Sequence, residues 1–158
     1  MDSGEYLNIV KEQLRAYDFQ EREVAEFDHP LFEKRDQGLI SDKSRTIIIK
    51  EVPESTVESV KNSAVFVKEN VVQNNSTIFN EDASTFQFYA IFIPPKSTKA
   101  MEIAVERAAK NQNSGSNWFL LPMLVDLDNE TLAYQDPSLF SHNQHHEMVN
   151  NIDKYFRV

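Results

Sequence analysis

Apolar side chains near the start of the chain recur at every third or fourth position, which is the spacing of one helix face. Asp2 and Glu5 have the spacing of a capping box, so a helix is expected to begin there. The stripe is narrow, which predicts packing on one side only, and it consists of Tyr6, Leu7, Val10, Leu14 and Tyr17.

Three apolar runs further along the chain, at 46–52, 86–93 and 118–127, are typical of strands because they are rich in β-branched or aromatic residues. The run at 86–93 is almost continuously apolar, which predicts a strand covered on both faces. Pro122 interrupts the third run and removes a ladder donor, so we expect an edge, a bulge or a break there. Residues 18–45 are harder to interpret: a short strand at 22–27 fits the pattern, and 41–45 is typical of a polar connection.

Helical patterns separate the three runs. Valines and alanines recur at helical spacing over 57–72, after a capping-box pair at Ser55 and Glu58, although the β-branched content of 64–72 would also fit a strand. A second helix is predicted after Ser97 as N-cap, and a third over 141–156. The third would turn four residues inward: Met148, Ile152, Tyr155 and Phe156.

Alternation of strands and helices predicts parallel βαβ crossovers, and therefore a single α/β domain over 1–158 with a mainly parallel or mixed sheet and flanking helices. If 22–27 and 64–72 are strands instead, the order becomes helix, strands, helix, strand, which is similar to the restriction-endonuclease-like core. That family holds its metal with an Asp and a Glu-x-Lys or Gln-x-Lys motif. Neither motif occurs in this sequence, so the alternative is such a core without its usual active site.

Composition narrows the functional classes. Eleven Phe among 158 residues indicate a real core, and the absence of Cys excludes disulfides, thiolate zinc sites and cysteine nucleophiles. The first residues do not resemble a signal peptide, and no apolar run approaches the roughly 20 residues of a membrane span. We therefore expect a cytoplasmic protein.

The net charge of −9 makes general nucleic-acid binding and attachment to anionic membranes poor fits, because both need clustered Lys and Arg. Solubility alone explains an acidic chain. The sharper interpretation is an acidic face, carried by residues 18–58, that binds a basic protein partner.

Two clusters at strand ends carry candidate chemistry. Lys96 and Ser97 follow a strand and open a helix, which would suit an anion, although Pro94 and Pro95 remove the amides that a phosphate loop needs. Asp126 and Asp128 end a buried strand, where ligand sites of parallel sheets gather, and Glu51 ends another. Their carboxylates could bind Mg²⁺; a polar turn is the simpler explanation.

A third cluster, His142, His145 and His146, places imidazoles on one helix face, as a transition-metal site would require. A polar helix start with one packed His explains the same pattern. No G-x-S-x-G elbow is present, so serine hydrolase chemistry has no support.

Two functions remain. The first is a non-catalytic interaction or regulatory protein, such as an accessory subunit or an immunity-type inhibitor, with no cofactor. The second is a metal-dependent phosphoester hydrolase or nuclease that uses the strand-end carboxylates and Mg²⁺. A homodimer formed through an edge strand near Pro122 or 131–134 is a further hypothesis.

Overall fold

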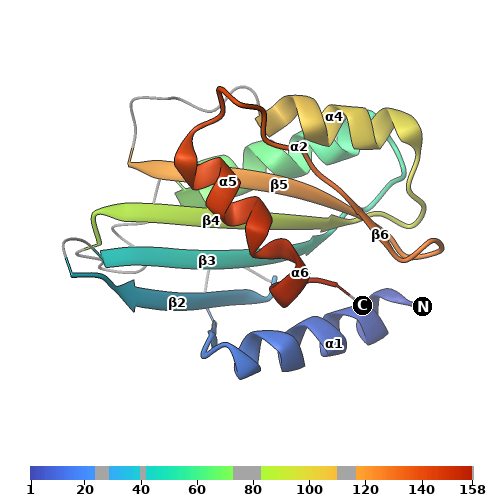
Figure 1. Ribbon diagram of the computed structural model, residues 1–158. Coiled ribbons are helices and arrows are strands. Elements are labelled where there is room, and N and C mark those ends of the chain that lie inside the picture. The colour runs from blue at the N-terminus through green and yellow to red at the C-terminus, as the bar shows by residue number, and fades with distance from the viewer. Residues whose placement is uncertain (24–28, 40–41, 73–82, 110–116, 158) are drawn as a thin grey trace.

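A computed structural model describes residues 1–23, 29–39, 42–72, 83–109 and 117–157 (Figure 1). One six-stranded sheet has the order β1-β2-β3-β4-β5-β6. Its middle strands β3, β4 and β5 are parallel, while β1, β2 and β6 pair antiparallel. The strands are β1 Gln20–Arg22, β2 Leu31–Gln37, β3 Asp42–Glu51, β4 Thr85–Ile93, β5 Trp118–Asp126 and β6 Thr131–Ala133.

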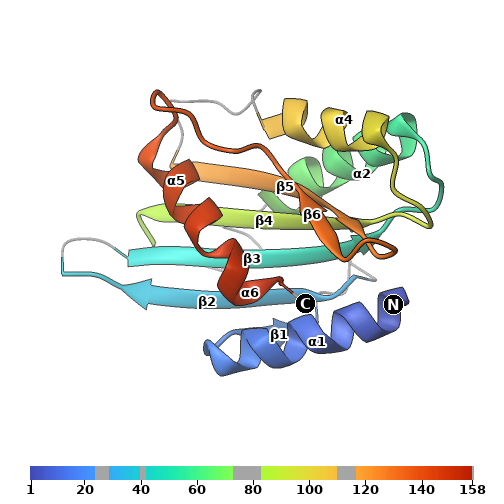
Figure 2. The ribbon, with the colours of Figure 1, turned by 45° about the vertical axis from the view of Figure 1, so that its right-hand side comes forward.

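Helices cover both faces of this sheet (Figures 1 and 2). The two crossover connections, α2 with its π-helical extension η1 and then α4, lie side by side on one face. The terminal helices α1, α5 and α6 cover the other face, which brings the two ends of the chain close together. Their bounds are α1 Ser3–Ala16, α2 Val57–Val67, η1 Lys68–Val72, α4 Lys99–Ala109, α5 Asn143–Asn150 and α6 Ile152–Tyr155.

Strand β4 shows why the sheet needs two layers of helices. Successive side chains of a strand point to opposite faces, and every residue of β4 after Thr85 is buried. Phe88 and Phe92 join the core under α2 and α4, whereas Tyr89 and Ile91 join the core under the terminal helices. The prediction that 86–93 is covered on both faces is therefore confirmed.

Hydrogen bonds from two buried tyrosines fasten the terminal helices. The hydroxyl of Tyr6 donates to the Phe156 carbonyl at 3.3 Å, and that of Tyr89 donates to the Met148 carbonyl at 3.2 Å. Burial raises the pKa of both phenols, so both remain protonated donors. The predicted inward residues of the last helix are all buried, although the helix itself is interrupted at Asn151.

The predicted α/β class, the three core strands and the flanking helices are confirmed. The polar connection expected at 41–45 is wrong from Asp42 onward, where β3 begins, and the alternative strand at 64–72 is helical. The predicted strand at 22–27 meets β1 only at Arg22, and 24–28 lie outside the described residues. The order from which the alternative core was predicted needs a strand at 64–72, and this segment is helical.

Helix starts follow the predicted capping chemistry with two shifts of one residue. The Asp2–Glu5 capping box is present. Thr56, not Ser55, caps α2, and the Thr98 hydroxyl, not that of Ser97, accepts from the Met101 N–H at the start of α4. In both cases the β-hydroxyl residue nearer the helix takes the cap.

Pro122 lies at an edge of the sheet, which is one of the three possibilities that the sequence predicted. Strand β5 pairs with β4 along one side, whereas β6 pairs only with Leu124, Val125 and Asp126 on the other side. Among the described residues, the first half of β5 thus has a strand neighbour on one side only, where a missing donor is tolerated.

Candidate functional site

A groove of about 780 Å³ runs between α2 and α4 over the sheet. Its floor is apolar and includes Phe92 of β4 with Leu120 and Pro122 of β5. Each helix adds an outer apolar row beside the residues it buries in the core, and Val65 and Ile103 stand in these rows with 52% and 37% of their surface exposed. Exposed, contiguous apolar surface of this kind marks binding sites more often than scattered single residues do.

The sides of the groove carry positive charge. Lys61 and Lys68 line it from the α2–η1 side and Arg107 from α4, and none of its described lining residues is acidic. This is a local reversal, because the chain has a net charge of −9. The groove therefore combines an apolar floor with basic sides, which suits an apolar segment that carries carboxylates.

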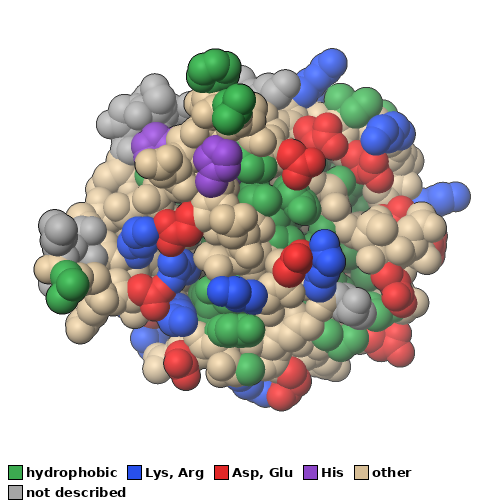
Figure 3. Space-filling view, viewed as in Figure 1, with side chains coloured by type: hydrophobic (Ala, Val, Ile, Leu, Met, Phe, Trp, Pro, Cys, Tyr) green, Lys and Arg blue, Asp and Glu red, His purple; other side chains and the backbone are tan. Residues whose placement is uncertain are grey.

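A second feature is a polar network on the opposite face of the sheet, where β2, β3 and β4 meet α5. Arg45, only 9% exposed, forms ion pairs with Asp36 and with Glu147, the latter at 2.7 Å. Lys43 also reaches Glu147, at 2.6 Å. Figure 3 shows such opposite charges intermixed beside α5.

Fully buried Gln87 completes the network. Its side-chain oxygen accepts from Arg45 Nε at 3.1 Å, and its amide donates to Gln144 of α5 at 2.5 Å. Burial alone would raise the pKa of Glu147, but hydrogen bonds and charge attraction from Lys43 and Arg45 lower it overall. Since the cations and carboxylates already satisfy one another, this network fixes α5 on the sheet.

The strand-end carboxylates are divided between two hollows. Asp126 holds its own turn: its carboxylate accepts from the Asp128 and Asn129 N–H groups at 3.1 Å and from the Asn129 side chain at 2.8 Å. The Asn129 side chain is the main reason that the pKa of Asp126 is lowered. Glu51 and Asp128 instead line a cleft of about 900 Å³ at the carboxyl ends of the parallel strands.

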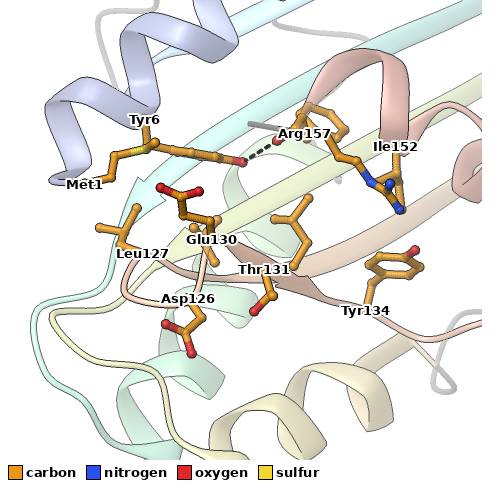
Figure 4. Close-up of a pocket in the computed structure, with 12 residues that line it drawn as sticks. Met1, Tyr6, Asp126, Leu127, Glu130, Thr131, Tyr134, Ile152 and Arg157 are labelled. Atoms are coloured by element: carbon orange, nitrogen blue, oxygen red, sulfur yellow. Dashed lines mark hydrogen bonds between the residues drawn. The ribbon is translucent and has the colours of Figure 1, made fainter.

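Asp126 borders a smaller pocket of about 360 Å³ between α1, α6 and the β5–β6 hairpin. In Figure 4, Glu130 lies between Tyr6 and Thr131, while the Asp126 carboxylate points away from Tyr6 and Arg157. Within the described part of the chain, no three His, Asp or Glu side chains are grouped so as to hold a metal ion. The Mg²⁺ hypothesis for Asp126, Asp128 and Glu51 stays a prediction.

Lys96, one of the two residues proposed to bind an anion, takes part in a contact within the chain. The backbone N–H of Lys96 donates to the Ser55 hydroxyl at 2.8 Å, which ties the turn after β4 to the turn after β3. The buried Ser97 hydroxyl has no hydrogen-bond partner, and Thr98 takes the helix cap. Anion binding at Lys96 and Ser97 stays a prediction.

The histidines are placed at the start of α5. His142 caps the helix through Nδ1, which accepts from the Gln144 N–H at 3.1 Å, and its ring packs against Phe119. His145 Nε2 lies 2.8 Å from the Gln135 carbonyl and donates to it. The simpler explanation, a helix start with packed imidazoles, accounts for these two residues. A metal site that includes His146 stays a prediction.

Sequence reasoning missed both the groove and the polar network. The groove had a usable signal, since Val57, Lys61, Val65 and Lys68 repeat at helical spacing beside the buried stripe of the same helix. The network had almost none, because Glu147 of α5 lies more than 100 residues from its partners Lys43 and Arg45 on β3.

Comparison of the chain with protein-family models, with curated proteins and with solved structures found no match. In the described part of the chain, no helix has both the length and the apolar character needed to cross a membrane.

Proposed function

We propose that this chain is a non-catalytic interaction or regulatory protein, and that the α2–α4 groove is its binding surface. The partner would insert an apolar segment flanked by acidic residues. The observation that carries this proposal is the coincidence of an apolar floor with three basic residues on the sides of one groove, in a chain of net charge −9.

The groove has the anatomy of a helix-binding surface. Two parallel ridges, α2 and α4, enclose a floor made by β4 and β5, and the partly exposed Val65 and Ile103 offer contacts on opposite sides. An amphipathic helix or a short apolar turn recognises such a groove through anchors that fill it. Glu or Asp beside those anchors would approach Lys61, Lys68 and Arg107, which favours acidic partners and disfavours basic ones.

The acidic stretch at 18–58 offers less support for a basic partner. Several of its carboxylates already pair with cations of the same chain: Glu21 with Lys11, Glu33 with Arg22, and Asp42 with Arg35. Exposed pairs of this kind contribute little stability, but they reduce the field that an acidic face would present. The groove, whose cations line one apolar surface, is therefore the better binding surface in this proposal.

Trp118 provides a direct assay, since it is the single tryptophan of the chain and packs against the same core as the groove, two residues before Leu120. Two synthetic amphipathic helices with identical apolar faces, one flanked by Glu and one by Lys, would be titrated while Trp118 fluorescence is recorded. We expect saturable binding of the Glu peptide, and binding at least about tenfold weaker for the Lys peptide.

Val65→Asp is the matched groove variant, because it places a carboxylate beside the basic side chains at an exposed position. Leu39→Asp is its control, at an apolar residue that is more exposed than Val65 and does not line the groove. Val65→Asp should weaken Glu-peptide binding at least about tenfold, and Leu39→Asp should leave it unchanged. Equal binding of both peptides, or equal effects of both substitutions, would contradict the groove as the binding surface.

A further inference from the structure

The segment between β6 and α5 projects two large apolar side chains into solvent. Leu139 and Phe140 are 94% and 98% exposed, more than any other large apolar residue of the described chain except Leu39. They form the tip of a turn in which the Ser141 N–H donates to the Ser138 carbonyl at 3.0 Å. Apolar side chains protrude where this segment crosses the top of Figure 3.

This turn is held in place on both sides. Ser138 N–H also donates to the Ser141 hydroxyl at 2.8 Å. Before the turn, the Gln135 carbonyl is bonded to His145; after it, the His142 ring packs on Phe119 with 4.6 Å between centroids. An anchored turn loses little conformational entropy when it binds, so the exposed pair is preorganised for insertion.

Tip and groove are complementary. The tip supplies Leu139 and Phe140, and the segment 135–142 carries Asp136 but no Lys or Arg. The groove supplies an apolar floor and three cations. Two adjacent large side chains of an ordered turn are the kind of anchor that fills a pocket at the centre of an interface.

We infer that the Leu139–Phe140 turn of one copy of this chain inserts into the α2–α4 groove of a second copy. The inference rests on the proposed function only in taking the groove as a binding surface. If both copies insert their turns, the contact is made twice around a two-fold axis and the assembly closes as a dimer. Asp136 then approaches the basic sides of the partner's groove, which gives the contact a dependence on salt concentration.

Sedimentation equilibrium of the full chain tests the association. We expect twice the monomer mass at high protein concentration, and a dissociation constant at least about tenfold higher for Phe140→Ser and for Val65→Asp. Leu39→Ser is the control for Phe140→Ser, and Leu39→Asp is the control for Val65→Asp; neither should change the mass. Circular dichroism of each variant verifies that the fold is retained, as their exposed positions lead us to expect. A wild-type chain that remains monomeric would overturn the inference, and so would a dimer that survives Phe140→Ser.

The absence of Cys allows a second test without background. One chain carries Leu139→Cys, which keeps Phe140 as an anchor, and a tagged chain carries Val65→Cys. Mixing and mild oxidation should give a disulfide-linked pair much faster than Leu39→Cys mixed with the same Val65→Cys chain, because a disulfide needs Cα atoms within about 7 Å. Equal rates for the two mixtures would show random collision and overturn the contact.

These experiments separate the two proposals. A monomeric chain whose Trp118 fluorescence still responds to the Glu-flanked peptide retains the binding groove and loses only the second copy as its occupant. A dimer that survives Val65→Asp and a Trp118 signal that never responds would remove the groove as well.

Discussion

Replacing Glu147 by Gln tests the polar network that holds α5 on the sheet. Glu147 accepts from Lys43 Nζ at 2.6 Å and from Arg45 Nη2 at 2.7 Å. Gln has the same shape but no charge, and its single carbonyl oxygen cannot receive both cations equally well. Arg45, with a side chain only 10% exposed, would keep Asp36 as its remaining carboxylate partner.

The magnitude follows from the two contacts that are weakened. A hydrogen bond to a charged group contributes about 1.5–3 kcal/mol when it is shielded from water. The Glu147 side chain is 30% exposed, so solvent screening reduces both contributions. We expect a loss of about 2 kcal/mol in the free energy of unfolding, which for a chain of this length lowers the melting temperature by about 4–8 °C.

The stability lost in Glu147→Gln should depend on pH. The folded-state pKa of Glu147 lies below its ordinary value of 4.5. A carboxyl with a depressed folded pKa contributes stability that is present above the unfolded pKa and is lost as the pH falls through the folded pKa. The difference between wild type and Glu147→Gln should therefore be complete at pH 7 and shrink steadily below about pH 4.5.

Thermal and urea unfolding, followed by circular dichroism from pH 7 to pH 3, measure this difference. Glu12→Gln is the control, because Glu12 forms an exposed pair with Arg15 on α1 and should change stability by less than about 0.5 kcal/mol. A Glu147→Gln loss that is no larger than the control, or that persists unchanged at pH 3, would refute the account of the network.

Three further outcomes are expected. Gln87→Leu should lower the free energy of unfolding by about 2 kcal/mol, because it removes a buried partner of Arg45; Gln87→Glu, measured alongside at pH 7, restores an acceptor and should recover part of the loss. Glu130→Gly should raise stability by about 0.5 kcal/mol in urea unfolding, since its φ of 53° is left-handed and relief of that strain outweighs the added freedom of the unfolded chain. Millimolar Mg²⁺ should leave the melting temperature unchanged, because the Asp126 carboxylate is committed to its turn; a rise that Asp126→Asn abolishes would instead support the hydrolase hypothesis.

The local pattern of apolar residues predicted the structure correctly where each face of a helix or strand has a uniform environment, either the core or solvent. The apolar run of β4 predicted burial on both faces, and helical spacing over 57–72 outweighed the strand propensity of its valines. Propensity is a weak prior beside a period that extends over four turns.

The pattern did not predict a strand where only part of the strand is apolar and the remainder is charged or polar. In β2, Leu31 and Phe32 are buried, but the remainder of the strand is charged or polar, so it looks like a loop. Its Asp36 and the Arg45 of β3 are tolerated because Arg45 pairs both with Asp36 on the neighbouring strand and with Glu147 of α5. A sequence alone does not reveal that the partner of Arg45 is Glu147, about a hundred residues away, so this network was not predictable.

The contact between Tyr6 and Phe156 has a consequence for biosynthesis. These residues are 150 positions apart, and the same face of the sheet is also covered by Met148, Ile152 and Tyr155. A ribosome releases the chain from its N-terminus, so α1 and strands β1 to β5 emerge before the residues that complete this core. Although α1 is available early, the part of this sheet face that α5 and α6 cover stays exposed on the nascent chain until synthesis has passed residue 156. Contacts of such long range slow folding.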